Sequence, residues 1–198
     1  MELNSFDTIY EKNIWGSGSS GLGSRYTRDN IKYIKYLDDM IKDKNIKNIC
    51  DFGCGDFEIM KHLDFKDINY TGVDLVKSVI DNNNDKFKKE NINFKINIDI
   101  IKKYDLVVIK DVLQHHENKY VEELLNQLID DNKYVLCING FKFLRKKPEK
   151  NNWITRDIHN RFRYHPIHSL KQPLINFKQY EINKYNHRCK EYILYEKC

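Results

Sequence analysis

The eight residues from Asp51 to Glu58, DFGCGDFE, decide the fold class of this chain. The first two end an apolar run over 46–52 that is typical of a buried strand, and the last two begin a segment with helical character, 57–63. The two glycines allow the backbone to turn sharply and to approach a ligand closely. A strand, a glycine-rich loop and a helix in this order are typical of a parallel sheet whose ligands bind beyond the carboxyl ends of its strands.

Strands and helices are predicted to alternate along the rest of the chain. A helix is expected to begin at Thr27 or Asp29, either of which can cap it, and to continue to Ile41. Residues 140–172 are irregular and basic. The apolar patterns predict helices over 77–88 and 120–129, strands over 70–75, 92–98, 106–109 and 134–138, and a C-terminal hairpin of 176–182 with 192–196. This alternation predicts an α/β fold with helices on both faces of the sheet.

An acidic residue follows the second predicted strand. Asp74 lies nineteen residues after Gly55, at the end of the strand over 70–75. A carboxylate at that place can accept hydrogen bonds from the two hydroxyls of a ribose. The glycine loop and Asp74 together therefore indicate a ligand that contains adenosine.

The acidic residues of the loop restrict the choice of ligand. A dinucleotide site has a third glycine where this chain has Glu58, and the carboxylates of Asp51 and Asp56 repel phosphate groups. The sequence Gly-Lys-Ser/Thr of triphosphate-binding loops does not occur in the chain. S-adenosylmethionine fits this loop, because it carries a ribose, an amino group and a sulfonium but no phosphate.

The motifs DFGCG over 51–55, GVD over 72–74 and YDLVVIKDVLQHH over 104–116 carry a resemblance to a known family. Over most of residues 46–139 the chain resembles the class I S-adenosylmethionine-dependent methyltransferases. It is most similar to a small branch with the patterns Asp-x-Gly-Cys-Gly-Asp and Lys-Asp-Val-Leu-Gln-His. The resemblance implies a doubly wound, Rossmann-like sheet of seven strands, mostly parallel, with an antiparallel C-terminal strand.

The resemblance also assigns residues to the cofactor. It places the DFGCG motif around the methionine part, Asp74 at the ribose and Asp99 near the adenine, and Lys110 and Asp111 on the methyl-transfer side. The cofactor-binding residues expected on this basis are Asp51, Gly53, Cys54, Gly55, Asp74, Leu75, Asp99 and Lys110. We predict a single methyltransferase domain, residues 1–198, with an N-terminal segment (1–45), a cofactor-binding core (46–139) and a basic acceptor-side segment with the hairpin (140–198).

Two adjacent histidines supply a candidate base. Methyl transfer is an in-line displacement at a sulfonium, so positioning supplies much of the acceleration. A hydroxyl acceptor must also lose a proton, for which histidine is suited. His115 is the first candidate, and Asp111 is expected to orient it or to act as an alternative base. We expect His116 to contact the substrate, and the alternative for either histidine is a purely structural role.

Positive charge is concentrated in residues 142–163. This segment has eight Lys and Arg residues against Glu149 and Asp157, whereas the formal net charge of the whole chain is only +5. Arginine forks beside aromatic rings suit a phosphate-bearing acceptor, most simply a nucleotide-linked sugar. The residues expected to contact it are Trp153, Arg161 and Arg163. The alternative is a solvated, lysine-rich loop.

A glycine- and serine-rich stretch near the start is predicted to act as a lid. Residues 16–24 hold four of the eight glycines. We expect this stretch to close over the cofactor, with Arg25 at the cofactor's carboxylate, and to exclude water from the reacting centre. An engineered linker is the rival interpretation of such a composition.

The cysteine and histidine residues bear on the cellular compartment and on metal binding. The five cysteines fit neither a disulfide framework nor a zinc spacing, and His159, His165 and His168 fit no familiar metal set. We therefore expect no metal and a reducing, cytoplasmic location. No apolar run is long enough to cross a membrane, and the first residues do not resemble a signal peptide.

Two other functions remain open at this point. An RNA methyltransferase would use 142–163 as its RNA-binding surface. A non-catalytic protein would keep the cofactor site as a scaffold. The sequence leaves undetermined the acceptor, the atom methylated, the need for a base and the oligomeric state.

Overall fold

The structure, a computed structural model, describes residues 4–16, 20–96, 103–116, 118–140, 155–156, 162–163, 181–187 and 190–197. The chain divides into two compact units, Met1–Ile100 and Ile101–Cys198. The boundary falls within 46–139, the range predicted to form the cofactor-binding core. Each unit has its own run of parallel strands, described in turn below.

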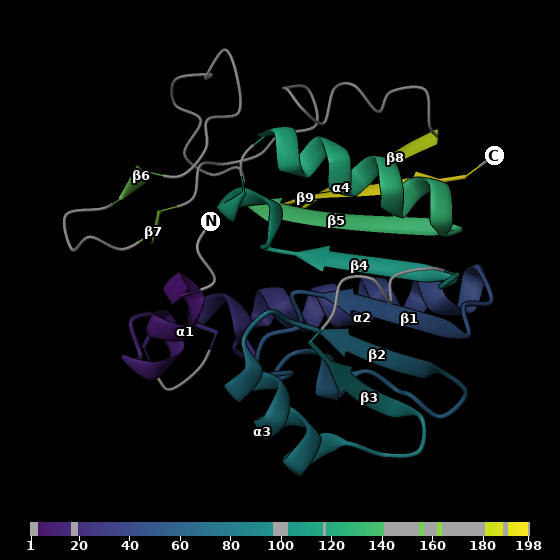
Figure 1. Cartoon of the computed structure of the whole chain (residues 1–198). Coiled ribbons are helices and arrows are strands. Elements are labelled where there is room, and N and C mark those ends of the chain that lie inside the picture. The colour runs from purple at the N-terminus through teal and green to yellow at the C-terminus, as the bar shows by residue number, and fades with distance from the viewer. Residues whose placement is uncertain are drawn as a thin grey trace. The chain divides into compact units, whose positions relative to one another are not determined.

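The first unit contains three parallel strands, as predicted. They are β1 (Asn48–Phe52), β2 (Asn69–Val73) and β3 (Ile92–Lys95), in the order β3-β2-β1. The arrows of all three point the same way in Figure 1. Ile49 and Cys50 of β1 are fully buried, as the apolar run over 46–52 predicts for a strand that is covered on both faces.

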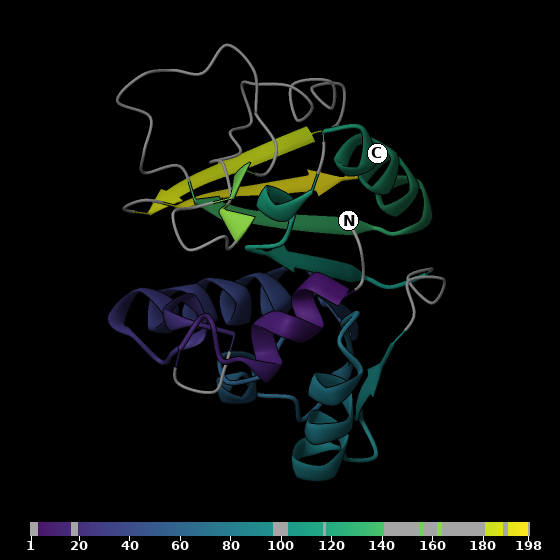
Figure 2. The ribbon, with the colours of Figure 1, turned by 60° about the vertical axis from the view of Figure 1, so that its left-hand side comes forward.

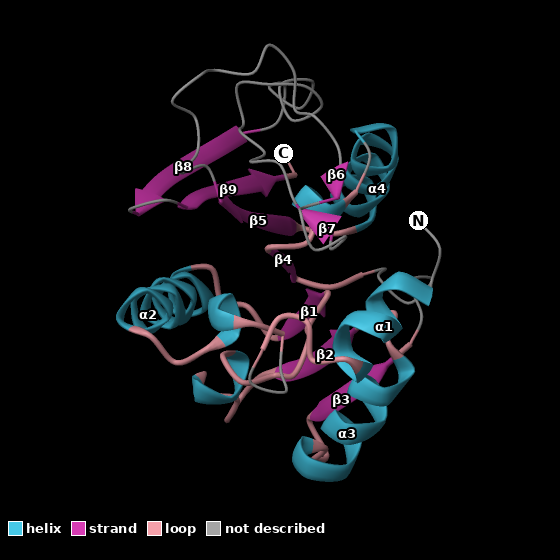
Figure 3. Ribbon diagram, turned by 90° about the vertical axis from the view of Figure 1, so that its left-hand side faces the viewer, coloured by secondary structure: helices cyan, strands magenta, loops and turns pink. Residues whose placement is uncertain are grey.

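Helices cover both faces of these strands. The predicted helices are α2 (Arg28–Asp43) and α3 (Lys77–Phe87), and α1 (Asn4–Glu11) was not foreseen. Figure 3 shows α2 on one face, and α1 and α3 on the other. Of the two caps considered for α2, Thr27 is the one used, because its hydroxyl accepts a hydrogen bond from the Asn30 N–H at 3.4 Å.

The predicted helix over 57–63 is a shorter element. Only Met60–His62 forms a helical turn, the 3-10 helix η2, and a second 3-10 turn, η1, spans Leu22–Ser24. Phe57 has a φ of 60°, which lies outside the right-handed helical region. The helix therefore cannot begin at Phe57, and the glycine loop is longer than the sequence pattern indicates.

The second unit contains four strands in the order β4-β5-β9-β8. They are β4 (Leu106–Lys110), β5 (Tyr134–Gly140), β8 (Glu181–His187) and β9 (Lys190–Glu196). β5 is parallel to β4, whereas β9 is antiparallel to both β5 and β8. In Figure 2 the green β5 lies beside the yellow β9 and β8. The core of this unit is fully buried and includes Ile109, Leu125, Leu136 and Ile193.

The other elements of this unit follow β4 and β5. The 3-10 turn η4 (Leu113–His115) and the helix α4 (Asn118–Asp131) follow β4, and α4 buries the apolar side predicted for 120–129. Two short strands, β6 (Thr155–Arg156) and β7 (Phe162–Arg163), pair within the stretch expected to be irregular.

The C-terminal hairpin is present, and its first strand extends beyond the predicted end at Ile182. β8 is described over Glu181–His187, and residues 176–180 of the expected strand lie outside the described residues. His187 pairs with Lys190, so only two residues connect the strands. A connection this short fixes the register of the hairpin from its turn outward, which places β8 over 181–187.

The strand orders of the two units are those of a doubly wound, Rossmann-like α/β fold with seven strands. The last strand of the chain, β9, runs antiparallel to its neighbours, as expected. None of the helices in the described part of the chain is long and apolar enough to cross a membrane.

Candidate functional site

The glycine loop of the first unit is held against the end of β2. The N–H groups of Gly53 and Cys54 both donate to the Val73 carbonyl, at 2.8 and 3.0 Å. Gly53 and Gly55 have φ values of 76° and 54°, a region that glycine enters at little cost. The sharp turn that the sequence predicts is therefore made at these two glycines.

Asp74 is fixed by the backbone at the end of β2. Its Oδ2 accepts from the Gly55 N–H and its Oδ1 from the Val76 N–H, each at 3.0 Å. Burial raises the pKa of this carboxyl, and the backbone N–H groups of Val76, Gly55 and Leu75 counteract part of the rise. Each carboxylate oxygen has a second lone pair. Asp74 can therefore accept further hydrogen bonds from a bound hydroxyl.

Two buried polar side chains help to hold the glycine loop in place. Asp51 is 4% exposed, and its Oδ2 accepts a hydrogen bond from the Tyr70 hydroxyl at 2.8 Å. Asn83 of α3 is fully buried and donates from Nδ2 to the Gly55 carbonyl at 2.7 Å. The carboxylate at the end of β1 thus has the partner that its burial requires. Asn83 was not singled out from the sequence, because nothing local marks an asparagine on a helix as a loop support.

The N-terminal segment is joined to the glycine loop through Ser20. The Ser20 N–H donates to Asp56 Oδ2, and the Asp56 N–H donates to Ser20 Oγ, both at 3.0 Å. The Tyr10 hydroxyl lies 2.6 Å from the same Ser20 Oγ. A Cβ added to Gly55 would lie 2.3 Å from Ser20 Oγ, so Ser20 is packed directly on the loop. We call the reciprocal pair of Ser20 and Asp56 the Ser20 clasp.

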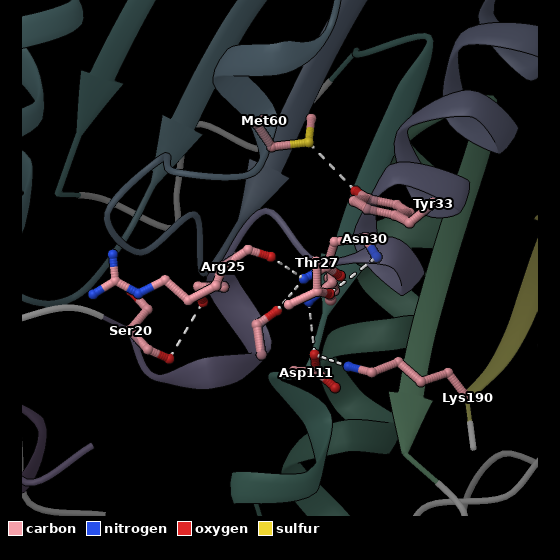
Figure 4. A network of polar contacts seen from close by, with 11 residues as sticks. Ser20, Arg25, Thr27, Asn30, Tyr33, Met60, Asp111 and Lys190 are labelled. Carbon is pink, nitrogen blue, oxygen red and sulfur yellow. Dashed lines mark hydrogen bonds and ion pairs between the residues drawn. The ribbon is translucent and has the colours of Figure 1, made fainter. Parts of the chain in front are cut away.

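The segment after the clasp is attached to α2. Asn30 Nδ2 donates to the carbonyl oxygens of Gly23 and Arg25, at 2.9 and 2.6 Å (Figure 4). The Tyr33 hydroxyl donates to Met60 Sδ at 3.4 Å and so joins α2 to η2. The backbone of Arg25 is therefore fixed in place, while its assignment to the cofactor's carboxylate stays a prediction.

Apolar side chains are exposed where β2 and β3 end. Leu75 and Ile96 are each 42% exposed. Leu75 was predicted as a cofactor contact, whereas Ile96 was not. Cys54 donates from Sγ to the Gly55 carbonyl, and burial raises its pKa, so it remains a thiol. A protonated thiol is not activated as a nucleophile, and the assignment of Cys54 to the cofactor stays a prediction.

In the second unit, three charged side chains meet at the end of β4. Asp111 Oδ2 accepts from Lys110 Nζ at 2.8 Å. It also accepts from Lys190 Nζ, as Figure 4 shows. Burial raises the pKa of Asp111, but the ammonium groups of Lys110 and Lys190 outweigh it and hold the pKa well below its usual range. We call these three residues the lysine–aspartate cluster. Lys190 lies 79 residues from Asp111 in the sequence, which is why no local pattern identifies it.

His115 and His116 follow this cluster in the chain. Burial lowers the pKa of each to about 4, although the nearby charge and backbone of Asp111 raise that of His115. The His116 ring lies against Tyr120, with 4.6 Å between ring centroids. Both imidazoles are therefore neutral at pH 7, which is the form that a general base requires.

The two histidines predict a loss of stability in acid. The unfolded chain takes up these protons near the ordinary pKa of 6.5, whereas the folded chain resists until about pH 4. We expect the free energy of unfolding to fall as the pH decreases from about 6.5 to about 4, and this slope to be smaller in His115→Gln and in His116→Gln. Urea denaturation at several pH values measures it, and an unchanged slope in both variants would contradict the burial argument.

Other predicted contacts lie outside the described residues. These are Asp99, Trp153 and Arg161, and of Arg163 only the backbone, in β7, is described. Within the ranges that the structure describes, no group of three or more His, Cys, Asp or Glu side chains is arranged to hold a metal ion.

Comparisons by sequence and by structure differ in outcome. No family model matches this chain, and no curated protein matches it. Solved structures do match. An S-adenosylmethionine-dependent methyltransferase from Clostridium acetobutylicum has a TM-score of 0.63 at 15% identity, covering 98% of each chain.

Two further structures hold ligands. The magnesium protoporphyrin IX methyltransferase ChlM of Synechocystis, with bound SAM, has a TM-score of 0.63 at 15% identity, covering 99% of this chain and 93% of that one. The DhpI-SAM-HEP complex has a TM-score of 0.65 at 11% identity, covering 98% and 94%. At such low identity these likenesses establish the fold.

Proposed function

We propose that this chain is an S-adenosylmethionine-dependent methyltransferase. The observation that carries the proposal is the carboxylate of Asp74, held by the Gly55 and Val76 N–H groups beside a glycine loop that contains further carboxylates. Such a site offers hydrogen-bond acceptors to the ribose hydroxyls. Its negative charge attracts an ammonium and a sulfonium and repels phosphates. The neighbours in fold that were crystallised with SAM support this choice.

The acceptor is proposed to be a hydroxyl on a small anionic molecule, most simply a nucleotide-linked sugar. The arginines of the basic segment, Arg161 and Arg163, supply forks for its phosphates. Neutral His115 takes the proton from the hydroxyl as the methyl group is transferred. Asp111 acts as a positioning residue, because its Oδ2 already accepts hydrogen bonds from two ammonium groups.

Transfer of labelled methyl from S-adenosylmethionine to separated pools of nucleotide sugars, RNA and protein tests this function. Label in the nucleotide-sugar pool is expected, and it should disappear in Asp74→Asn. Label in RNA, with binding that weakens steeply as salt rises, would favour the alternative of an RNA methyltransferase that uses 142–163. Binding of S-adenosylmethionine without transfer to any pool would favour the scaffold.

The Ser20 clasp predicts that the N-terminal segment contributes to cofactor affinity. Deleting residues 1–26 removes the clasp while leaving the Thr27 cap of α2 in place. At about 1 kcal/mol per hydrogen bond, we expect S-adenosylhomocysteine to bind on the order of tenfold more weakly. Calorimetric titration measures the affinity.

A point variant separates the clasp from the rest of the segment. Ser20→Ala removes the Oγ shared by Asp56 and Tyr10, and Ser78→Ala, on the exposed side of α3, is the matched control. Ser20→Ala should reproduce part of the loss, and Ser78→Ala none of it. Equal affinity in the deletion variant and the full chain would refute the lid.

A further inference from the structure

Two hydroxyl groups lie against the glycine loop, close to Asp74. The Tyr10 hydroxyl of α1 is 2.6 Å from Ser20 Oγ. A Cβ added to Gly55 would lie 2.3 Å from Ser20 Oγ and 3.4 Å from the Tyr10 hydroxyl, so both oxygens are close to the Cα of this glycine. The N–H of the same glycine donates to Asp74 Oδ2 at 3.0 Å. We call Tyr10 and Ser20 the hydroxyl pair, and Gly55 links it to the carboxylate that is proposed to bind the ribose.

The ring of Tyr10 is held in place independently of its hydroxyl. Trp15 packs edge-on against it, with 5.6 Å between the ring centroids, and against Phe6, with 6.2 Å. Ile9, the neighbour of Tyr10 in α1, is buried at 3% exposure and anchors the helix. Replacing Tyr10 by phenylalanine therefore keeps these packing contacts and removes the hydroxyl alone.

The hydroxyl pair has one more donor than its own contacts use. Ser20 Oγ accepts from the Asp56 N–H at 3.0 Å, so the proton of Ser20 is not part of that bond. The hydrogen bond between the two hydroxyls uses one of their two protons, whichever of them donates it. Among the contacts between described residues, one O–H of the pair therefore remains to donate to a ligand.

The remaining donor belongs to a neutral group. Burial raises the pKa of Tyr10 well above its usual range, and the charges of Asp74 and Asp56 raise it further, whereas the hydrogen bond with Ser20 lowers it. The phenol therefore stays protonated at pH 7, and no phenolate forms that would repel an anion. The hydroxyl pair is thus a neutral hydrogen-bond donor in surroundings that are rich in carboxylates.

The cofactor of the proposed function has one group that the acidic loop does not suit. The carboxylates of Asp51, Asp56 and Asp74 attract its ammonium and sulfonium, but they repel its own carboxylate. A carboxylate that leaves water needs hydrogen-bond donors, because it is an acceptor only. The hydroxyl pair supplies such a donor beside the glycine loop without adding negative charge.

We propose that the hydroxyl pair binds the carboxylate of S-adenosylmethionine and makes the site selective for the cofactor over its decarboxylated form. This inference rests on the proposed function, since it assigns a contact to the proposed cofactor. A hydrogen bond to a charged acceptor is stronger than one between neutral groups, so a single hydroxyl is enough to give a measurable preference. Arg25 is a separate candidate for the same carboxylate, and the hydroxyl pair does not depend on it.

Two ligands that differ only in this carboxylate test the proposal. They are S-adenosylhomocysteine and its decarboxylated form, which keeps the adenosine and the ammonium. Calorimetric titration measures the affinity of each ligand for the unchanged protein, for Tyr10→Phe and for Ser20→Ala. Tyr26→Phe is the matched control, because Tyr26 lies in the same N-terminal segment, is 55% exposed and stacks its ring on His62, a contact that phenylalanine can keep.

We expect the unchanged protein to bind S-adenosylhomocysteine about fivefold more tightly than the decarboxylated form. Loss of the donating hydroxyl should weaken the binding of S-adenosylhomocysteine by about fivefold and that of the decarboxylated form by less than about twofold. This difference should appear in at least one of Tyr10→Phe and Ser20→Ala, and that variant identifies the hydroxyl that donates to the carboxylate. Tyr26→Phe should match the unchanged protein with both ligands.

Equal losses for the two ligands in both variants would overturn the proposal, because the hydroxyl pair would then act only by holding the glycine loop. Equal affinities of the unchanged protein for the two ligands would also overturn it, and the proposed function would stand. If the unchanged protein binds neither ligand, the proposed function fails and this proposal fails with it. Retained binding of the decarboxylated form shows that a variant is folded.

Discussion

Asp74→Asn is expected to weaken the binding of S-adenosylhomocysteine by about a hundredfold or more. The amide has one acceptor oxygen in place of two, and the backbone N–H groups of Gly55 and Val76 compete for it. Two hydrogen bonds from ribose hydroxyls to a charged oxygen are worth about 3 kcal/mol together at the low end of the usual range. The loss should appear in the dissociation constant measured by calorimetric titration.

Asp81→Asn is the matched control for this prediction. Asp81 lies on the exposed side of α3, where it pairs with Lys77. It should leave the affinity unchanged, and circular dichroism should show that both variants are folded. An Asp74→Asn protein that is folded and binds S-adenosylhomocysteine as tightly as before would remove the main support for the proposed function.

Asp111→Asn is expected to lower the free energy of unfolding by about 3 kcal/mol or more at pH 7. The substitution leaves Lys110 and Lys190 facing each other without the carboxylate that both of them contact. Asparagine tolerates a positive φ, so the change adds little backbone strain at this position. Urea denaturation measures the difference.

The dependence of this effect on pH has a definite sign. The folded pKa of Asp111 lies below its ordinary value of 3.8, so its stabilising effect is complete above about pH 4 and is lost as the pH falls through the folded pKa. The double variant with Lys190→Met should recover part of the loss, because only one ammonium then remains. Equal stability of Asp111→Asn and the unchanged protein at pH 7 would mean that the cluster is well solvated.

Local patterns predicted most of the elements and the positions of the glycine loop and Asp74. The apolar run before Gly53 predicted β1. The spacing of apolar residues predicted α2, α3 and α4 to within a few residues of their bounds. These predictions succeed because a buried strand or an amphipathic helix leaves a periodic trace in its own segment. The prediction of a helix over 57–63 is wrong. The cause is also local, because the spacing of apolar residues does not reveal the positive φ of Phe57.

Other parts of the candidate residues depend on contacts between residues that are distant in the sequence. Lys190 lies 79 residues from Asp111, and Ser20 lies 36 residues from Asp56, so no window of sequence contains either pair. The strand order β4-β5-β9 places the first pair together. The hairpin register, set by the two-residue connection between β8 and β9, places Lys190 opposite Gly140.

The sequence by itself therefore determined the fold class, the glycine loop and Asp74, because each is encoded in residues that are neighbours along the chain or that end consecutive strands. Only the tertiary structure decided how Asp111 is charged, that Ser20 holds the loop and that Lys190 belongs to the candidate site. The physical reason is that burial and charge pairing act through space. They shift a pKa or fix a side chain only once strands from distant parts of the chain have come together.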